Sequence, residues 1–182
     1  MNEVQPIREK RQINAIKKAL RGRDLLLFTI GINSGLRISD ILALKVGDVR
    51  GKDFVAITEG KTKKSKRFFF NAAIKKAVAD LIPSEANDDD WLFPSRKGSK
   101  AITRVRAYGI LNEAVERAGL SDKLGTIGCH SLRKTFGYHA YKNGTDLTLL
   151  QSIFNHSKQS VTLRYIGINQ DRIDEVYANV NL

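Results

Sequence analysis

Several features that mark particular classes of protein are scarce in this sequence. Cys129 is the only cysteine among 182 residues, so a framework of intrachain disulfides is excluded and a reducing cytoplasm is indicated. No apolar run approaches the ~18 residues of a membrane span, and the charged N-terminus has no apolar signal-peptide core. Repeats, low-complexity stretches and proline- or serine-rich linkers are missing too. We therefore expect one soluble, cytoplasmic domain over residues 1–182.

Acidic residues are the scarcer charge. Thirty-one lysines and arginines face nineteen aspartates and glutamates, which leaves a net charge of +12 and an isoelectric point near 9.9. Such a balance favours a polyanionic partner, because neutralised phosphates release their counterions. Charge alone leaves open a basic protein that binds no nucleic acid and sits in an acidic complex.

The spacing of apolar residues predicts a mainly helical domain with one small antiparallel sheet, an α+β fold. Two short runs rich in β-branched or aromatic residues, 53–58 and 67–70, are expected to form the sheet, joined by a basic hairpin over 59–66. The expected helices are 7–20, 24–33, 39–44, 72–81, 101–118, 130–142, 147–154, 161–166 and 170–180.

Basic side chains in the first half of the chain supply candidate phosphate ligands. Arg37 stands at the entry of a short apolar helix, where its planar fork suits either a phosphate or an ion pair with Asp40 or Asp48. Gly60-Lys61-Thr62 is not a nucleotide-binding loop, because that motif needs a glycine where Val55 stands. The hairpin is expected to touch the DNA backbone through Lys61, Lys63, Lys64, Lys66 and Arg67.

His130 and Arg133 lie three residues apart on a predicted helix, so both project from one face. An imidazole can accept a proton near neutral pH, and a guanidinium can hold a phosphate oxygen. A capped helix start with a solvent-exposed arginine is the alternative. His139 lies at a different helical angle and is predicted to be structural. The cysteine and the histidines show no standard metal-ligand spacing, so no metal site is expected.

His156 and Tyr165 lie close together near the end of the chain. A phenol has a pKa of about 10, so nucleophilic attack near neutral pH requires cationic neighbours or a base. The alternative for Tyr165 is a ring that packs on an amphipathic helix and hydrogen-bonds through its hydroxyl. Spacing alone does not select Tyr165 among five tyrosines.

Taken in order, these residues resemble the active-site signature of the tyrosine recombinase (phage integrase) family. GLRISDILALKVGDV resembles the family's first arginine box, HSLRKTF its His-x-x-Arg box, and NHSKQSVTLRY its closing segment, so the resemblance covers nearly the whole chain. Two positions depart from the pattern. Lys134 stands where the family often has a second histidine, and Asn155 replaces a glycine, which puts in doubt the turn that presents His156.

The resemblance implies a catalytic domain of a site-specific DNA recombinase or integrase. Tyr165 is expected to attack a DNA phosphate, forming a 3′-phosphotyrosine link and releasing a 5′-hydroxyl without metal, ATP or other cofactor. Arg37 and Arg133 are expected to stabilise the transition state, and His130 to act as general base. Lys61 is expected to protonate the leaving oxygen, with Lys63 and Lys64 as alternatives. His156 is expected to hydrogen-bond a phosphate oxygen.

The resemblance also implies partners. Family members act on double-stranded DNA as tetramers, and a separate N-terminal core-binding domain closes around the DNA. That domain is absent from residues 1–182, and a naturally short member is favoured over an excised domain. Two alternatives stay open: a DNA-binding module of the same fold that does not cut, and a type IB topoisomerase-like enzyme that relaxes DNA.

Overall fold

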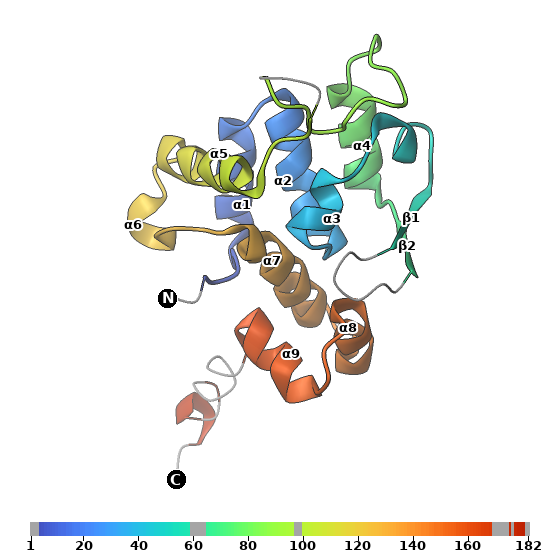
Figure 1. Ribbon diagram of the computed structural model, residues 1–182. Helices are drawn as coiled ribbons and strands as arrows, with labels where there is room; N and C mark the ends of the chain where they lie inside the picture. Colours follow the sequence, from blue (N-terminus) through green and yellow to red (C-terminus); the bar gives the residue numbers. More distant parts are fainter. Residues whose placement is uncertain (1–3, 59–64, 97–99, 169–174, 176, 181–182) are drawn as a thin grey trace.

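The computed structural model describes residues 4–58, 65–96, 100–168, 175 and 177–180 (Figure 1). Its strands are β1 (Phe54–Thr58) and β2 (Ser65–Phe69). Its helices are α1 (Lys10–Ala19), α2 (Gly22–Ser34), α3 (Ile38–Leu42), α4 (Ala72–Leu81), α5 (Arg104–Arg117), α6 (Ser121–Leu124), α7 (Cys129–Lys142), α8 (Leu147–Phe154) and α9 (Gln159–Ile166), with the 3-10 turn η1 (Val46–Asp48). The predicted mainly helical fold with a small antiparallel sheet is confirmed.

Helix α2 lies at the centre of the fold and packs against α1, α3, α4 and α7 (Figure 1). Its sequence is apolar around nearly its whole circumference, as expected of a helix surrounded by others. Leu26, Leu27, Phe28 and Ile30 are all buried, and each such side chain contributes roughly 1.5–3 kcal/mol of burial free energy. The buried Leu132 of α7 belongs to the same core. This packing holds α7 in place.

The two strands form an antiparallel pair in which Phe54 lies opposite Phe69 and Val55 opposite Phe68. Because side chains alternate between the faces of a sheet, one face turns inward and the other outward. Val55 is buried, whereas Phe54 and Phe69 are 41% and 58% exposed. The predicted strands are confirmed, although β2 starts and ends earlier than expected. Most of the predicted hairpin, residues 59–64, lies outside the described residues.

Helices α8 and α9 pack at one end of α7 around a small apolar cluster of their own (Figure 1). Leu150, Phe154, Ile166 and Ile168 are all at most 1% exposed, and aromatic residues of α7 pack against them. Tyr165 belongs to this cluster rather than to the main core. Its position therefore depends on a few local contacts with α7 and α8.

The segment before α1 runs across α7. The backbone N–H of Ile7 donates to Thr135 Oγ1 at 2.8 Å, and His139 Nε2 lies 3.0 Å from the Ile7 carbonyl oxygen. Arg8 donates to the carbonyl oxygen of Gly167 at 3.0 Å, so the segment ties α7 to the end of α9. The structural role predicted for His139 is confirmed. The predicted helix start at Ile7 is wrong, because Ile7 bonds to α7 side chains and α1 begins at Lys10.

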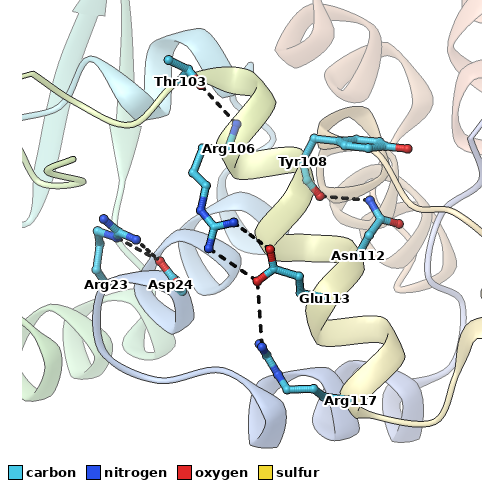
Figure 2. A network of polar contacts seen from close by, with 8 residues as sticks. All are labelled: Arg23, Asp24, Thr103, Arg106, Tyr108, Asn112, Glu113 and Arg117. Carbon is cyan, nitrogen blue, oxygen red and sulfur yellow. Dashed lines mark hydrogen bonds and ion pairs between the residues drawn. The ribbon is translucent and has the colours of Figure 1, made fainter. Parts of the chain in front are cut away.

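Helix α5 begins at Arg104 and not, as predicted, at 101. Thr103 caps it, since its Oγ1 accepts a hydrogen bond from the N–H of Arg106 at 3.1 Å (Figure 2). Asn112 then bonds both backbone groups of Ile127, at 2.8 and 3.0 Å, which fixes the approach to α7. The sequence did not predict η1 or α6.

The last predicted helix, 170–180, lies largely outside the described residues, although 175 and 177–179 are helical. None of the helices in the described ranges is long and apolar enough to cross a membrane.

Candidate active site

Tyr165 stands on α9 with its ring half-buried among aromatic neighbours. The ring centroid lies 5.5 Å from that of Phe154 and 5.0 Å from that of His156, the latter in an edge-to-face arrangement. Its hydroxyl oxygen lies 3.4 Å from Nδ1 of His130. The structure thus brings Tyr165 together with both histidines of the predicted site, from three separate segments.

Arg133 is the buried centre of the site. It is 4% exposed, and its guanidinium donates to the carbonyl oxygens of Gly35 and of Phe154, the latter at 2.9 Å. The guanidinium carbon also lies 4.7 Å from the Phe154 ring centroid. Arg133 therefore connects the segment leading to Arg37 with the end of α8, instead of pointing into solvent as the alternative interpretation required.

Arg37 is the residue before α3 and is half-buried, with an extended backbone conformation. Gly35, two residues earlier, ends α2 with a φ of 62° and lies against Phe136 of α7. Its positive φ and this close contact suit a residue without a Cβ. The charge of Arg37 acts on both Tyr165 and His130, so the structure gathers Arg37 with the rest of the site.

The environment shifts the pKa values of Tyr165 and His130 in opposite directions. Burial raises the pKa of Tyr165, while the charges of Arg133 and Arg37 oppose that rise. The pKa of His130 is lowered, first by desolvation of its ring and then by the charges of Arg104, Arg133, Lys134 and Arg37. At neutral pH the phenol is protonated and the imidazole is neutral, so His130 can accept the phenol proton.

His156 is presented by the turn after α8. Asn155 adopts the left-handed conformation there, with φ 54° and ψ 47°, which asparagine tolerates better than most residues. The replacement of glycine at this position therefore leaves the turn in place. Nδ1 of His156 lies 3.0 Å from the hydroxyl of the fully buried Thr162, and this contact fixes the orientation of the ring.

The basic hairpin is only partly described. Lys61, Lys63 and Lys64 lie outside the described residues. The backbone of Lys66 pairs with Ile57. Arg67 is exposed on the outer face of the sheet, its guanidinium 5.0 and 4.7 Å from the ring centroids of Phe54 and Phe69. In this position Arg67 contacts the sheet rather than Tyr165.

Two further cations that sequence reasoning did not assign lie beside the site. An open pocket of about 1200 Å³ is lined by Tyr165, His130, Lys134 and Arg104, among others. Arg104 is exposed at the start of α5, and among charged neighbours it has the largest effect on the pKa of His130. Lys134 was noted in the sequence only as a departure from a motif. For Arg104 the sequence carried no signal, because only the fold brings α5 next to α7.

No group of three potential metal ligands occurs among the described residues. The site instead gathers one phenol, two imidazoles and several cationic side chains within a mainly helical fold. Such a site and fold define the catalytic domain of a tyrosine recombinase. The Phage integrase family model matches residues 7–172, and the chain therefore belongs to this family of integrase and recombinase enzymes.

Known proteins agree with this assignment. The chain is 44% identical over 180 residues to "Probable integrase/recombinase YoeC" of Bacillus subtilis (strain 168), covering 97% of each. It is 32% identical over 174 residues to "Tyrosine recombinase XerC" of Erythrobacter litoralis (strain HTCC2594), covering 94% of this chain and 55% of the relative. The chain thus spans about half the length of XerC.

Solved structures share the fold. The XerA recombinase crystal structure matches with a TM-score of 0.77 and 21% identity, covering 100% of this chain and 68% of XerA. XerH site-specific recombinase, in a post-cleavage complex with its palindromic difH substrate, matches with a TM-score of 0.70 and 23% identity, covering 98% of this chain and 54% of XerH.

Proposed function

We propose that this chain cuts and rejoins double-stranded DNA in the cytoplasm, with Tyr165 as nucleophile and a 3′-phosphotyrosine intermediate. One observation supports this proposal above all others. The Tyr165 hydroxyl lies 3.4 Å from His130 Nδ1, in a site where the charges of Arg133 and Arg37 act on the phenol. A phenol that lies beside an imidazole and within the field of two guanidiniums is suited to attack a phosphate diester.

In the proposed step, the phenol proton passes to His130 while the Tyr165 oxygen forms a bond to phosphorus. The bond from phosphorus to the 5′ oxygen breaks, and Lys61 protonates that oxygen. Arg37 and Arg133 hold the equatorial oxygens, whose charge grows in the transition state, and His156 donates to one of them. The guanidiniums supply the charge compensation, so we assign no role to a metal. The phosphotyrosine link conserves the energy of the broken bond, so resealing by a 5′-hydroxyl needs no ATP.

The pocket beside Tyr165 suggests where the duplex lies. Its border includes the start of α5, where Arg104 is exposed and Val105 and Tyr108 are 79% and 43% exposed. With a net charge of +12, the chain can neutralise several phosphates. The crystal structure of XerH holds that recombinase bound to its palindromic difH substrate. We assign backbone contacts to Lys63, Lys64, Lys66 and Arg67 of the hairpin, and further DNA contacts to α5.

Association with further copies on DNA, up to a tetramer, is part of the proposal. Leu149 and Ile153 on α8 are 60% and 37% exposed, and near the end of the chain Tyr177 and Val180 are 80% and 60% exposed. Exposed apolar side chains on two separate parts of a chain suit a contact in which one copy binds the next. We propose that the part of the chain with Tyr177 and Val180 binds α8 of a neighbouring copy.

A trapping experiment tests the function. A pool of nicked duplexes with a randomised central region is incubated with the chain, because the short strand lost from a nick prevents resealing. We expect an SDS-resistant complex whose DNA-linked peptide contains Tyr165. Tyr165→Phe should lose the complex, while Tyr141→Phe, which alters another aromatic residue beside the same apolar cluster, should keep it. DNA binding without any trapped complex would instead support the non-cleaving module.

A further inference from the structure

Lys134 places a buried positive charge against the nucleophile. It follows Arg133 on α7, is 4% exposed, and lines the pocket that also contains His130. Its Nζ lies 5.2 Å from the centroid of the Tyr165 ring. At this distance the ammonium group makes a cation–π contact with the ring of the proposed nucleophile.

We propose that Lys134 is a positioning residue for the nucleophile: its ammonium group, lying over the ring of Tyr165, holds the ring in place and favours the phenolate. The proposal rests on the proposed function, in which Tyr165 attacks the phosphate. It assigns to Lys134 a role separate from that of Arg37 and Arg133, whose guanidiniums are expected to bind the phosphate oxygens.

The physical reason is that a cation over an aromatic ring acts differently on the two protonation states. Over a neutral phenol it is attracted by the ring quadrupole alone. Over a phenolate it is attracted by a full negative charge as well, and this attraction is large where water is partly excluded. Lys134 therefore stabilises the phenolate more than the phenol. Burial raises the pKa of Tyr165, and the charges of Arg133 and Arg37 oppose that rise; the proposal adds the ammonium group of Lys134, which lies over the ring.

Other charged or titratable groups face Tyr165 from each neighbouring element. His130 and Arg133 lie on α7, Arg37 before α3, and His156 after α8. Arg104 of α5 acts on His130. Once the arginines bind a phosphate diester, its negative charge offsets much of their effect on the phenol. The ammonium of Lys134, on the ring itself, keeps its effect during attack.

Lys134 neither gains nor loses a proton in this scheme. The O–H bond of Tyr165 breaks, and the proton moves to His130 and then to solvent. The oxygen-to-phosphorus bond forms as the bond to the 5′ oxygen breaks. Lys134 also helps to lower the pKa of His130. This makes His130 a weaker base, but it lets the imidazolium release its proton readily to solvent.

Two variants separate charge from packing. Lys134→Met keeps a long flexible side chain but removes the charge, whereas Lys134→Arg keeps the charge. Circular dichroism melting checks that each variant folds. If Lys134→Met shows no cooperative transition, Lys134→Gln replaces it and the same comparison is made.

The first measurement uses no DNA. N-acetylimidazole acetylates phenolates, and peptide mass spectrometry gives the rate at Tyr165, with the exposed Tyr108 as internal reference. From pH 6 to 10 we expect Lys134→Met to slow Tyr165 labelling by about tenfold, the equivalent of one pKa unit, and Tyr108 labelling to stay unchanged. Lys134→Arg should restore the rate. Equal rates in wild type and Lys134→Met, or equally slow rates in both variants, would overturn the proposal.

The second measurement is the rate of trapped-complex formation at saturating nicked DNA. Lys134→Met should be slower by about tenfold, with DNA affinity within about twofold of wild type, because we assign the ammonium group of Lys134 to the ring of Tyr165 and not to a phosphate. A loss of affinity at an unchanged trapping rate would mean a DNA contact and reject the positioning role. If wild type traps no DNA but labelling still depends on the charge, the proposed function fails, while the stabilisation of the Tyr165 phenolate by Lys134 stands.

Discussion

Replacing Gly35 with alanine tests how closely the segment that carries Arg37 approaches α7. A Cβ on Gly35 would lie 2.6 Å from Cδ1 and 2.8 Å from Cε1 of Phe136, and the residue has a φ of 62°. The left-handed conformation costs a non-glycine residue roughly 1–2 kcal/mol. Pressing an extra carbon against a packed ring adds about 1–3 kcal/mol. Gly35→Ala should therefore lower the free energy of unfolding by about 2–5 kcal/mol.

Gly51 provides the matched control. Its φ is 65°, but a Cβ there would have nothing within 4 Å, so Gly51→Ala should cost only the backbone term of roughly 1–2 kcal/mol. Urea unfolding followed by circular dichroism gives both values. The structure also predicts that Gly35→Ala slows DNA trapping, because the Gly35 carbonyl accepts from Arg133. Equal losses of stability at the two glycines would refute the close approach of Gly35 to Phe136.

Three further predictions follow from contacts around the site. Thr162→Val removes the hydroxyl that fixes His156 and should slow trapping by about fivefold, since a hydrogen bond contributes about 1 kcal/mol; an unchanged trapping rate would exclude a role for this contact. Arg8→Met removes the hydrogen bond to Gly167 and should speed amide hydrogen exchange in α9 but not in α4. Unchanged exchange in α9 would show that this bond does not hold the helix in place. Because the folded protein lowers the pKa of His130 below 6.5, folding favours the neutral ring, so wild type should lose stability relative to His130→Gln as pH falls below about 6.5. Parallel pH curves in thermal melts would contradict that shift.

The sequence predicted the elements that carry strong apolar spacing or clear boundary residues. Helices 72–81 and 147–154 have the predicted bounds, since asparagine or aspartate caps each start. Local spacing could not place Ile7, because its backbone bonds to Thr135, far along the chain. The start of α5 was predicted early because the capping role of Thr103 depends on where the preceding loop turns.

The candidate site was predictable as a set of residue types in order, and less so as an arrangement. The helical spacing of His130 and Arg133 predicted that they share a face. It did not predict that Arg133 is buried and donates hydrogen bonds to the carbonyl oxygens of Gly35 and Phe154. The positions of Lys134 and Arg104 beside Tyr165 depend on how α5, α7 and α9 pack. No local pattern encodes such packing between distant segments.

The proposed mechanism requires that Arg37, Arg133 and Tyr165 all reach one phosphate. Crystallography with tungstate, a phosphate analogue that scatters anomalously, tests this most directly. We expect one strong anomalous peak within hydrogen-bonding distance of both Arg37 and Arg133 and next to the Tyr165 hydroxyl. Anomalous peaks only at surface lysines, with none among these three side chains, would contradict a shared phosphate site.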